Sequence, residues 1–140
     1  MNDYTATIGI ECHVQLKTKT KLFAPVGNDA REAPPNTLIS HICLGMPGAL
    51  PVLNKGAVEL AVKAAAALKT HAQKYSVFDR KHYFYPDLPK GYQITQLYYP
   101  IILGGQVDIV VDGEKKTVHI TRAHLEEDAG KSTHPAGKHY

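Results

Sequence analysis

The sequence predicts an α+β fold in which a largely antiparallel sheet packs against one long helix. Three patterns lead to this prediction. Residues Thr5 to Leu16 alternate between apolar and polar side chains, which is typical of a half-buried strand. An alanine-rich stretch from Asn54 to about Lys69 has helical spacing, and two apolar runs flank the turn Asp112-Gly113 like the arms of a hairpin.

The composition is that of a soluble globular domain, with 140 residues of which 44% are hydrophobic and 21% charged. No apolar run approaches the roughly 20 residues needed to cross a bilayer, and the N-terminus lacks the pattern of a secretory signal. Cys12 and Cys43 are too few for a disulfide framework. We therefore expect a cytoplasmic protein without membrane contact. The net charge of +3 permits an RNA partner without arguing for one, and nothing points to DNA.

The first half of the chain is expected to form two strands, a loop and the helix. In Thr5–Leu16 the apolar side chains share one face, and Glu11 and His13 lie on the other. Pro25–Asn36 is rich in turn-forming residues and predicts a loop, whereas Leu38–Leu44 predicts a short buried strand.

Asn54 is a suitable N-cap for the helix. The apolar residues with helical spacing are Val58, Ala61, Val62, Ala65 and Leu68. The many alanines would let this helix pack closely against the sheet.

The second half is expected to be mostly extended. It divides into a strand with an aromatic end, a constrained loop and a further extended segment: Ser76–Tyr85, Pro86–Tyr92 and Gln93–Tyr99. The hairpin arms are Val107–Val111 and Thr117–Leu125. The alternation slips within the second arm, and a bulge or bend near Arg122 would reconcile its two halves.

Two groups of polar residues with carboxylates could hold a cation. Glu11 and His13 project from one strand face, where they could share a divalent cation or could simply be solvated polar residues. The run Glu126-Glu127-Asp128 could likewise be a magnesium site or a solvated acidic turn. Lys131 follows Gly130, but the glycine that a P-loop requires five residues earlier is absent; Lys131 could still reach a phosphate.

A loop of aromatic and basic residues could bind a nucleotide, since aromatic rings stack on bases and lysines hold phosphates. These residues are Lys81, Tyr83, Tyr85, Lys90 and Tyr92. An aromatic core cluster capped by solvated lysines is the alternative.

Four long blocks resemble the B subunit (GatB) of tRNA-dependent amidotransferases: 8–16, 44–55, 80–94 and 120–132. The resemblance implies a fold similar to the catalytic domain of glutamine synthetase. It also implies ATP- and Mg²⁺-dependent phosphorylation of the side-chain carboxylate of Glu-tRNA(Gln) or Asp-tRNA(Asn), followed by amidation. The implied partners are an amidase A subunit that supplies ammonia, a small C subunit and the mischarged tRNA.

Matched by position, the resemblance implies a metal and phosphate set of Glu11, His13 and Glu126 or Glu127, together with Lys131. The lysines and tyrosines of the aromatic loop would face the nucleotide. Many family members carry cysteine pairs that bind zinc, but here only Cys43 remains at the matching positions, so we expect no zinc.

Residues 1–140 correspond to the N-terminal part of the family's catalytic domain. The helical and tail domains that hold tRNA in the family are expected to be absent. A non-catalytic remnant that docks onto the amidase subunit is therefore the alternative function.

Overall fold

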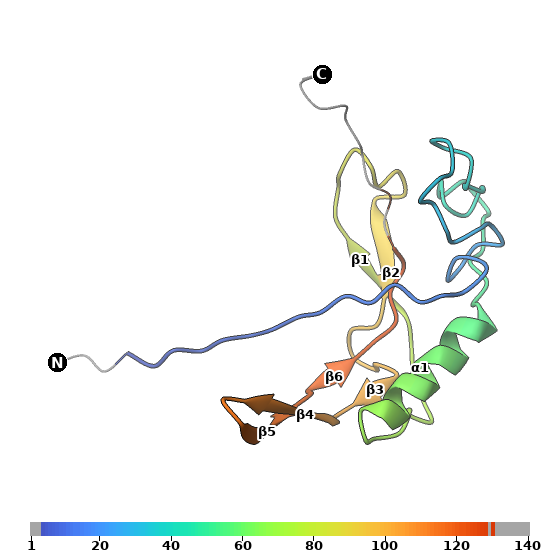
Figure 1. Ribbon diagram of the computed structural model, residues 1–140. Coiled ribbons are helices and arrows are strands. Elements are labelled where there is room, and N and C mark those ends of the chain that lie inside the picture. The colour runs from blue at the N-terminus through green and yellow to red at the C-terminus, as the bar shows by residue number, and fades with distance from the viewer. Residues whose placement is uncertain (1–3, 129, 131–140) are drawn as a thin grey trace.

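The computed structural model describes residues 4–128 and residue 130. This part of the chain forms one helix and six short strands (Figure 1). They are α1 (Lys55–Ala67), β1 (Asp79–His82), β2 (Tyr92–Thr95), β3 (Ile102–Leu103), β4 (Gln106–Val111), β5 (Glu114–His119) and β6 (Arg122–Ala123). The strands form three antiparallel pairs, β1 with β2, β3 with β6 and β4 with β5. The content agrees with the predicted α+β class, but the described strands form separate pairs and not the single sheet that was expected.

Helix α1 confirms the prediction made from its local sequence. The side chain of Asn54 accepts a hydrogen bond of 2.9 Å from the backbone N–H of Gly56, and so caps the first turn. Ala57, Ala61 and Ala65 are buried, which places the small side chains on the inner face. Ala61 and Ala65 belong to a core cluster with Ile101, Ile102 and Leu125. No helix in the described residues is long and apolar enough to cross a membrane.

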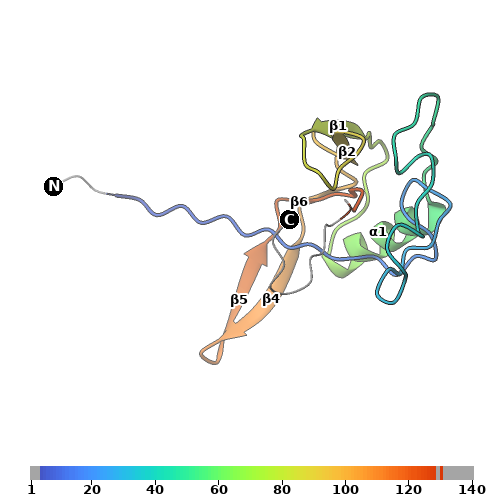
Figure 2. The same ribbon diagram turned by 90° about the horizontal axis from the view of Figure 1, so that it is seen from above.

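The prediction of a strand over Thr5–Leu16 is wrong. The segment runs as an extended chain away from the rest of the molecule, as the blue trace shows in Figures 1 and 2. Ile8, Ile10 and Val14 are 83%, 86% and 79% exposed. Alternation favours a strand only when another segment supplies the paired hydrogen bonds, and the described part of the chain offers no such partner here.

The predicted strand Leu38–Leu44 is also wrong, because the segment folds into consecutive turns. The backbone N–H of Leu44 donates to the carbonyl of Ser40, at 3.1 Å. The hydroxyl of Ser40 accepts a hydrogen bond from the N–H of Ile42, at 3.2 Å. Such local bonds from serine compete with strand pairing. The predicted loop Pro25–Asn36, by contrast, contains neither helix nor strand.

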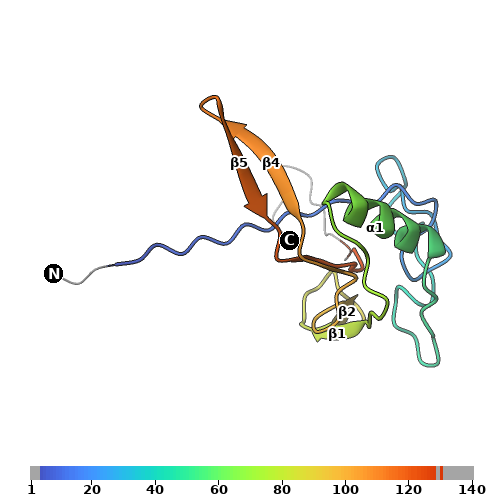
Figure 3. The same ribbon diagram turned by 90° about the horizontal axis from the view of Figure 1, so that it is seen from below.

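The hairpin of β4 and β5 is confirmed and projects from the body of the molecule (Figure 3). Asp112 and Gly113 have φ angles of 54° and 80°, the conformation of a type I′ turn. β5 ends at His119, and β6 begins at Arg122 on a different partner, β3. The slip in the alternation near Arg122 therefore marks the point where the chain leaves one strand pair for another.

Asp108 ties this hairpin to the end of α1. Its carboxylate accepts hydrogen bonds from Lys69 at 2.7 Å and Thr117 at 2.8 Å, and it lies 3.2 Å from the ammonium of Lys115. The bond from Lys69, followed by those from Thr117 and Lys115, lowers the pKa of Asp108 below its ordinary value. A depressed carboxyl pKa contributes stability above the unfolded value of about 3.9, and this contribution is lost as the pH falls through the folded value.

We expect Asp108→Asn to lower the melting temperature at neutral pH, with a difference from the wild type that narrows below about pH 4. Thermal melts followed by circular dichroism across this range would measure it. Asp112→Asn in the hairpin turn is the control, because asparagine also adopts positive φ, and it should leave the melting temperature unchanged. A difference for Asp108→Asn that stays constant with pH would contradict the assignment.

Candidate functional site

The segment that follows β6 is held alongside β2, and this arrangement builds the candidate site. The N–H of Leu125 donates to the side-chain oxygen of Gln96 at 3.0 Å, and the N–H of Glu127 donates to the carbonyl of Ile94 at 2.9 Å. Successive side chains of an extended chain point in opposite directions. Leu125 and Glu127 therefore point one way, and His124 and Glu126 point the other.

Glu126 meets the two candidate residues of the N-terminal segment. Nδ1 of His13 lies 3.4 Å from Oε1 of Glu126, and Nε2 of His13 lies 3.2 Å from Oε1 of Glu11. The side chains of Glu11 and His13 are 77% and 70% exposed, whereas that of Glu126 is 26% exposed. The structure thus brings together three of the predicted metal and phosphate residues. Within residues 4–128 and 130, however, no group of three or more His, Cys, Asp and Glu side chains is placed so that it could hold a metal ion by itself.

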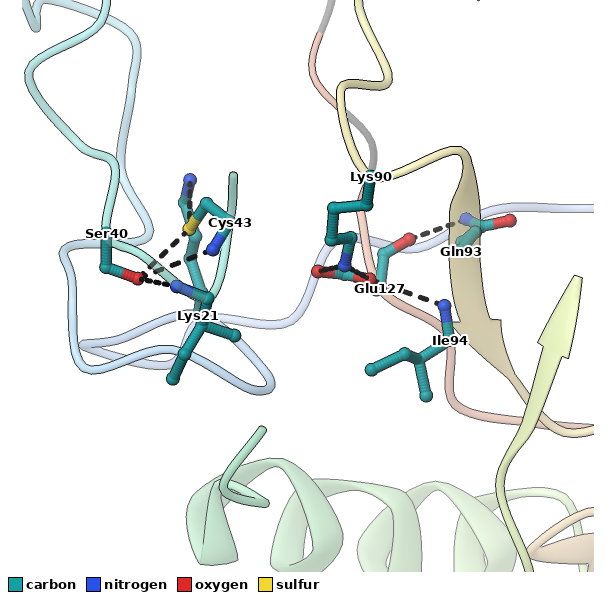
Figure 4. Close-up of polar contacts among 8 residues, drawn as sticks. Lys21, Ser40, Cys43, Lys90, Gln93, Ile94 and Glu127 are labelled. Carbon is teal, nitrogen blue, oxygen red and sulfur yellow. Dashed lines mark hydrogen bonds and ion pairs between the residues drawn. The ribbon is translucent and has the colours of Figure 1, made fainter. Parts of the chain in front are cut away.

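Glu127 has different surroundings from Glu126, although the sequence placed both in one set. Its carboxylate forms an ion pair with the ammonium of Lys90 (Figure 4). The side chains of Lys90 and Glu127 are only 4% and 18% exposed. The backbone N–H of Ile94 also donates to the Glu127 carboxylate, at 3.3 Å, and Gln93 donates to its carbonyl. Glu127 is therefore tied to β2 and Lys90.

The predicted nucleotide residues lie on and beside the β1–β2 pair. The ammonium of Lys81 lies 5.5 Å from the ring of Tyr83, whose centroid is 5.7 Å from that of Tyr85. The ammonium of Lys90 lies 4.9 Å from the ring of Tyr92. Each lysine is therefore within the range of a cation–π contact with a tyrosine of the same set.

A further cation joins this group without having been predicted. The guanidinium carbon of Arg80 lies 4.5 Å from the centroid of the Tyr92 ring. Arg80 lies on β1, opposite Ile94 in the register of the pair. Its position one residue before Lys81 was the only sign of it in the sequence. Its contact with Tyr92 depends on the pairing of β1 with β2.

Tyr83 connects the aromatic loop with the acidic residues. Burial raises the pKa of its phenol, and the negative charges of Glu126, Asp87 and Glu127 raise it further. The pKa of Tyr83 thus reflects the acidic residues near the aromatic loop.

Two residues that were not predicted also contact Glu126. Nε2 of His124 lies 3.5 Å from Oε2 of Glu126, and the hydroxyl of Thr95 donates to the same oxygen at 3.4 Å. The alternation places His124 and Glu126 on one face, which was the available signal for His124. Nothing in the local sequence indicated Thr95. Lys131, the last predicted site residue, lies outside the described residues.

Cys43 lies in the turn segment, away from the exposed Cys12 of the N-terminal segment, and both thiols are free. The sulfur of Cys43 is 4.0 Å from the ammonium of Lys21 and 3.5 Å from the hydroxyl of Ser40 (Figure 4). The expectation of no zinc stays a prediction.

The predicted site therefore combines two carboxylates and an imidazole with a loop of basic and aromatic residues. The chain matches the family model described as GatB/GatE catalytic domain over residues 6–140, and it belongs to this family. The predicted relationship to the B subunit of tRNA-dependent amidotransferases is thereby confirmed.

Curated relatives agree with this assignment. The chain is 57% identical over 131 residues to the B subunit of the aspartyl/glutamyl-tRNA(Asn/Gln) amidotransferase of Thermotoga sp. (strain RQ2). It is 56% identical over 137 residues to the protein of the same name from Elusimicrobium minutum, and 54% identical over 134 residues to that from Natronomonas pharaonis. These matches cover 94%, 97% and 95% of the chain but only 27%, 28% and 27% of the relatives. The chain thus spans little more than a quarter of their length.

Proposed function

We propose that this chain forms the N-terminal part of the catalytic domain in the B subunit of an aminoacyl-tRNA amidotransferase. In this role it holds ATP and Mg²⁺ while the γ-phosphoryl group passes to the side-chain carboxylate of Glu-tRNA(Gln) or Asp-tRNA(Asn), and ADP leaves. Ammonia from a partner amidase then attacks the acyl carbon, and phosphate leaves. A small C subunit completes the complex. A glutamine synthetase-like fold for the whole domain and a cytoplasmic location belong to the same proposal.

The contact of His13 with both Glu11 and Glu126 is the observation that carries this proposal. Phosphoryl transfer depends mainly on positioning and on the neutralisation of phosphate charge. Mg²⁺ prefers oxygen ligands and commonly takes one or two carboxylates, while phosphates and water fill the remaining positions. Glu11 and Glu126 fit that requirement as an open set of donors. His13 lies between them and is suited to orienting them or a phosphate.

The chemistry of the basic aromatic loop supports the proposal of a nucleotide site. Its rings offer faces for a base, and Lys81 and Arg80 offer charges for phosphates. Besides burial, the negative charge of Glu126 contributes to the raised pKa of Tyr83, which supports a nucleotide site beside the acidic residues. Lys90 is already paired with Glu127, so we assign it a supporting role in this loop.

Calorimetric titration of ATP into the chain, with and without Mg²⁺, tests the proposal. We expect Mg²⁺-dependent binding that Glu126→Gln weakens by about ten-fold or more, because the variant loses a charged ligand for the cation. Glu59→Gln on the exposed face of α1 is the matched control and should bind like the wild type. The melting temperature of both variants should stay close to that of the wild type.

The absence of Mg²⁺-dependent binding by the folded chain would contradict a nucleotide site built from these residues alone. It would favour the alternative in which the chain docks onto an amidase partner. The exposed apolar side chains of Thr5–Leu16 offer a surface for that role. A pull-down with the amidase would then separate the two functions.

A further inference from the structure

The two carboxylate oxygens of Glu126 have different partners. Oε2 receives the hydroxyl of Thr95 at 3.4 Å and faces Nε2 of His124 at 3.5 Å. Oε1 faces Nδ1 of His13 at 3.4 Å. Oε2 thus has one hydrogen-bond donor, Thr95, and one nearby imidazole, His124, and these two neighbours restrict the direction in which Oε1 can point.

The partners on the Oε2 side belong to the better-packed part of the site. Thr95 is 7% exposed and lies at the end of β2, in register with Asp79 of β1. The side chain of His124 is 23% exposed, and the backbone beside it is held by the hydrogen bond from the N–H of Leu125 to the side chain of Gln96, directly after β2. Glu11 and His13, by contrast, lie on an exposed segment without strand pairing. The fold therefore supports Glu126 from one side only.

We propose that His124 and Thr95 are positioning residues that hold Oε2 of Glu126, so that Oε1 is directed toward the Glu11–His13 pair. The consequence for cation binding rests on the function proposed above, whereas the orientation of Glu126 does not. Residues that orient a carboxylate ligand commonly change metal affinity by about 10- to 100-fold when they are removed. Neither His124 nor Thr95 needs to touch the cation in this arrangement.

The orientation is measured first, in the metal-free chain of 140 residues, by the ¹³Cδ resonance of Glu126. We expect His124→Ala and Thr95→Val to shift this resonance, because each removes a partner of Oε2. His124→Gln should restore it in large part, since glutamine can donate from a similar position. His119→Ala on the exposed face of β5 is the matched control and should leave it unchanged. Thr95→Val keeps the shape of the buried side chain, so a shift of the resonance in this variant would not be due to misfolding.

The consequence is then measured by the electron paramagnetic resonance signal of Mn²⁺, used as the probe for the divalent cation. We expect His124→Ala to weaken Mn²⁺ binding by about ten-fold or more and His124→Gln to recover most of the affinity. A Glu126 resonance that stays unchanged in both His124→Ala and Thr95→Val would overturn the proposal. Shifted resonances with unchanged Mn²⁺ affinity would show that the orientation of Glu126 does not affect cation binding. If the wild type bound no Mn²⁺, the proposed function would fail, while the resonance would still decide the orientation.

Discussion

Replacement of Lys90 by methionine is expected to destabilise the chain by about 3–5 kcal/mol, since it removes one member of a buried ion pair. The side chain of Lys90 is only 4% exposed, and its ammonium contacts both carboxylate oxygens of Glu127. Without it, the Glu127 carboxylate retains the backbone N–H of Ile94 as a donor. A charge left in low dielectric without its partner is among the most costly changes in a folded protein.

Urea denaturation of wild type and variants would measure this cost. The matched control is Lys55→Met, which removes an exposed partner of Glu59 on α1 and should change the free energy of unfolding by less than about 1 kcal/mol. The double variant Lys90→Met, Glu127→Leu should be less destabilised than the sum of its single changes, because no buried charge then lacks a partner. Similar effects for Lys90→Met and Lys55→Met would contradict the structural role of the pair.

This result also bears on any functional test of the aromatic loop. A Lys90 variant that fails to bind ATP could have lost its fold around β2 as well as a nucleotide contact. Lys81→Met avoids this ambiguity, because Lys81 is exposed and its ammonium lies over the ring of Tyr83 instead of in a buried ion pair.

Replacement of Gln96 by leucine is expected to destabilise the chain by about 2–6 kcal/mol, from two buried N–H groups at about 1–3 kcal/mol each. The residue is 1% exposed, directly after β2. Its side-chain oxygen accepts hydrogen bonds from the backbone N–H of Ile101 at 3.1 Å and of Leu125 at 3.0 Å. Its amide nitrogen donates to the hydroxyl of Ser76. Leucine fills a similar volume but leaves these groups unsatisfied.

The unfolding midpoint in urea, with an unchanged slope, would report this loss. Gln106→Leu is the control, because Gln106 bonds to the carbonyl of Leu68 through its backbone N–H, which the substitution keeps. A change within about 0.5 kcal/mol is expected for this control. Gln96→Leu should also loosen the segment that carries His124 and Glu126, since the N–H of Leu125 holds it in place. A variant as stable as the wild type would show that water replaces the lost bonds.

The local sequence was sufficient for the elements whose hydrogen bonds are local. The cap at Asn54 and the alanine face of α1 follow from residues a few positions apart, and the turn Asp112-Gly113 follows from two residues that accept positive φ. The prediction of a strand at Thr5–Leu16 was wrong because the hydrogen bonds of a strand are not local. Its alternation is present, but a strand depends on a partner that lies elsewhere in the chain or outside it.

The sequence by itself determined the family of this protein, the helix and the hairpin. It also predicted a set of residues for a cation and a nucleotide, which stays a prediction. Only the tertiary structure decided how neighbouring members of that set are used. Glu126 and Glu127 are adjacent and chemically identical, yet one faces His13 and the other faces Lys90. Side chains alternate along an extended segment, and the packing of that segment against β2 determines which carboxylate is paired in the interior and which faces the N-terminal segment.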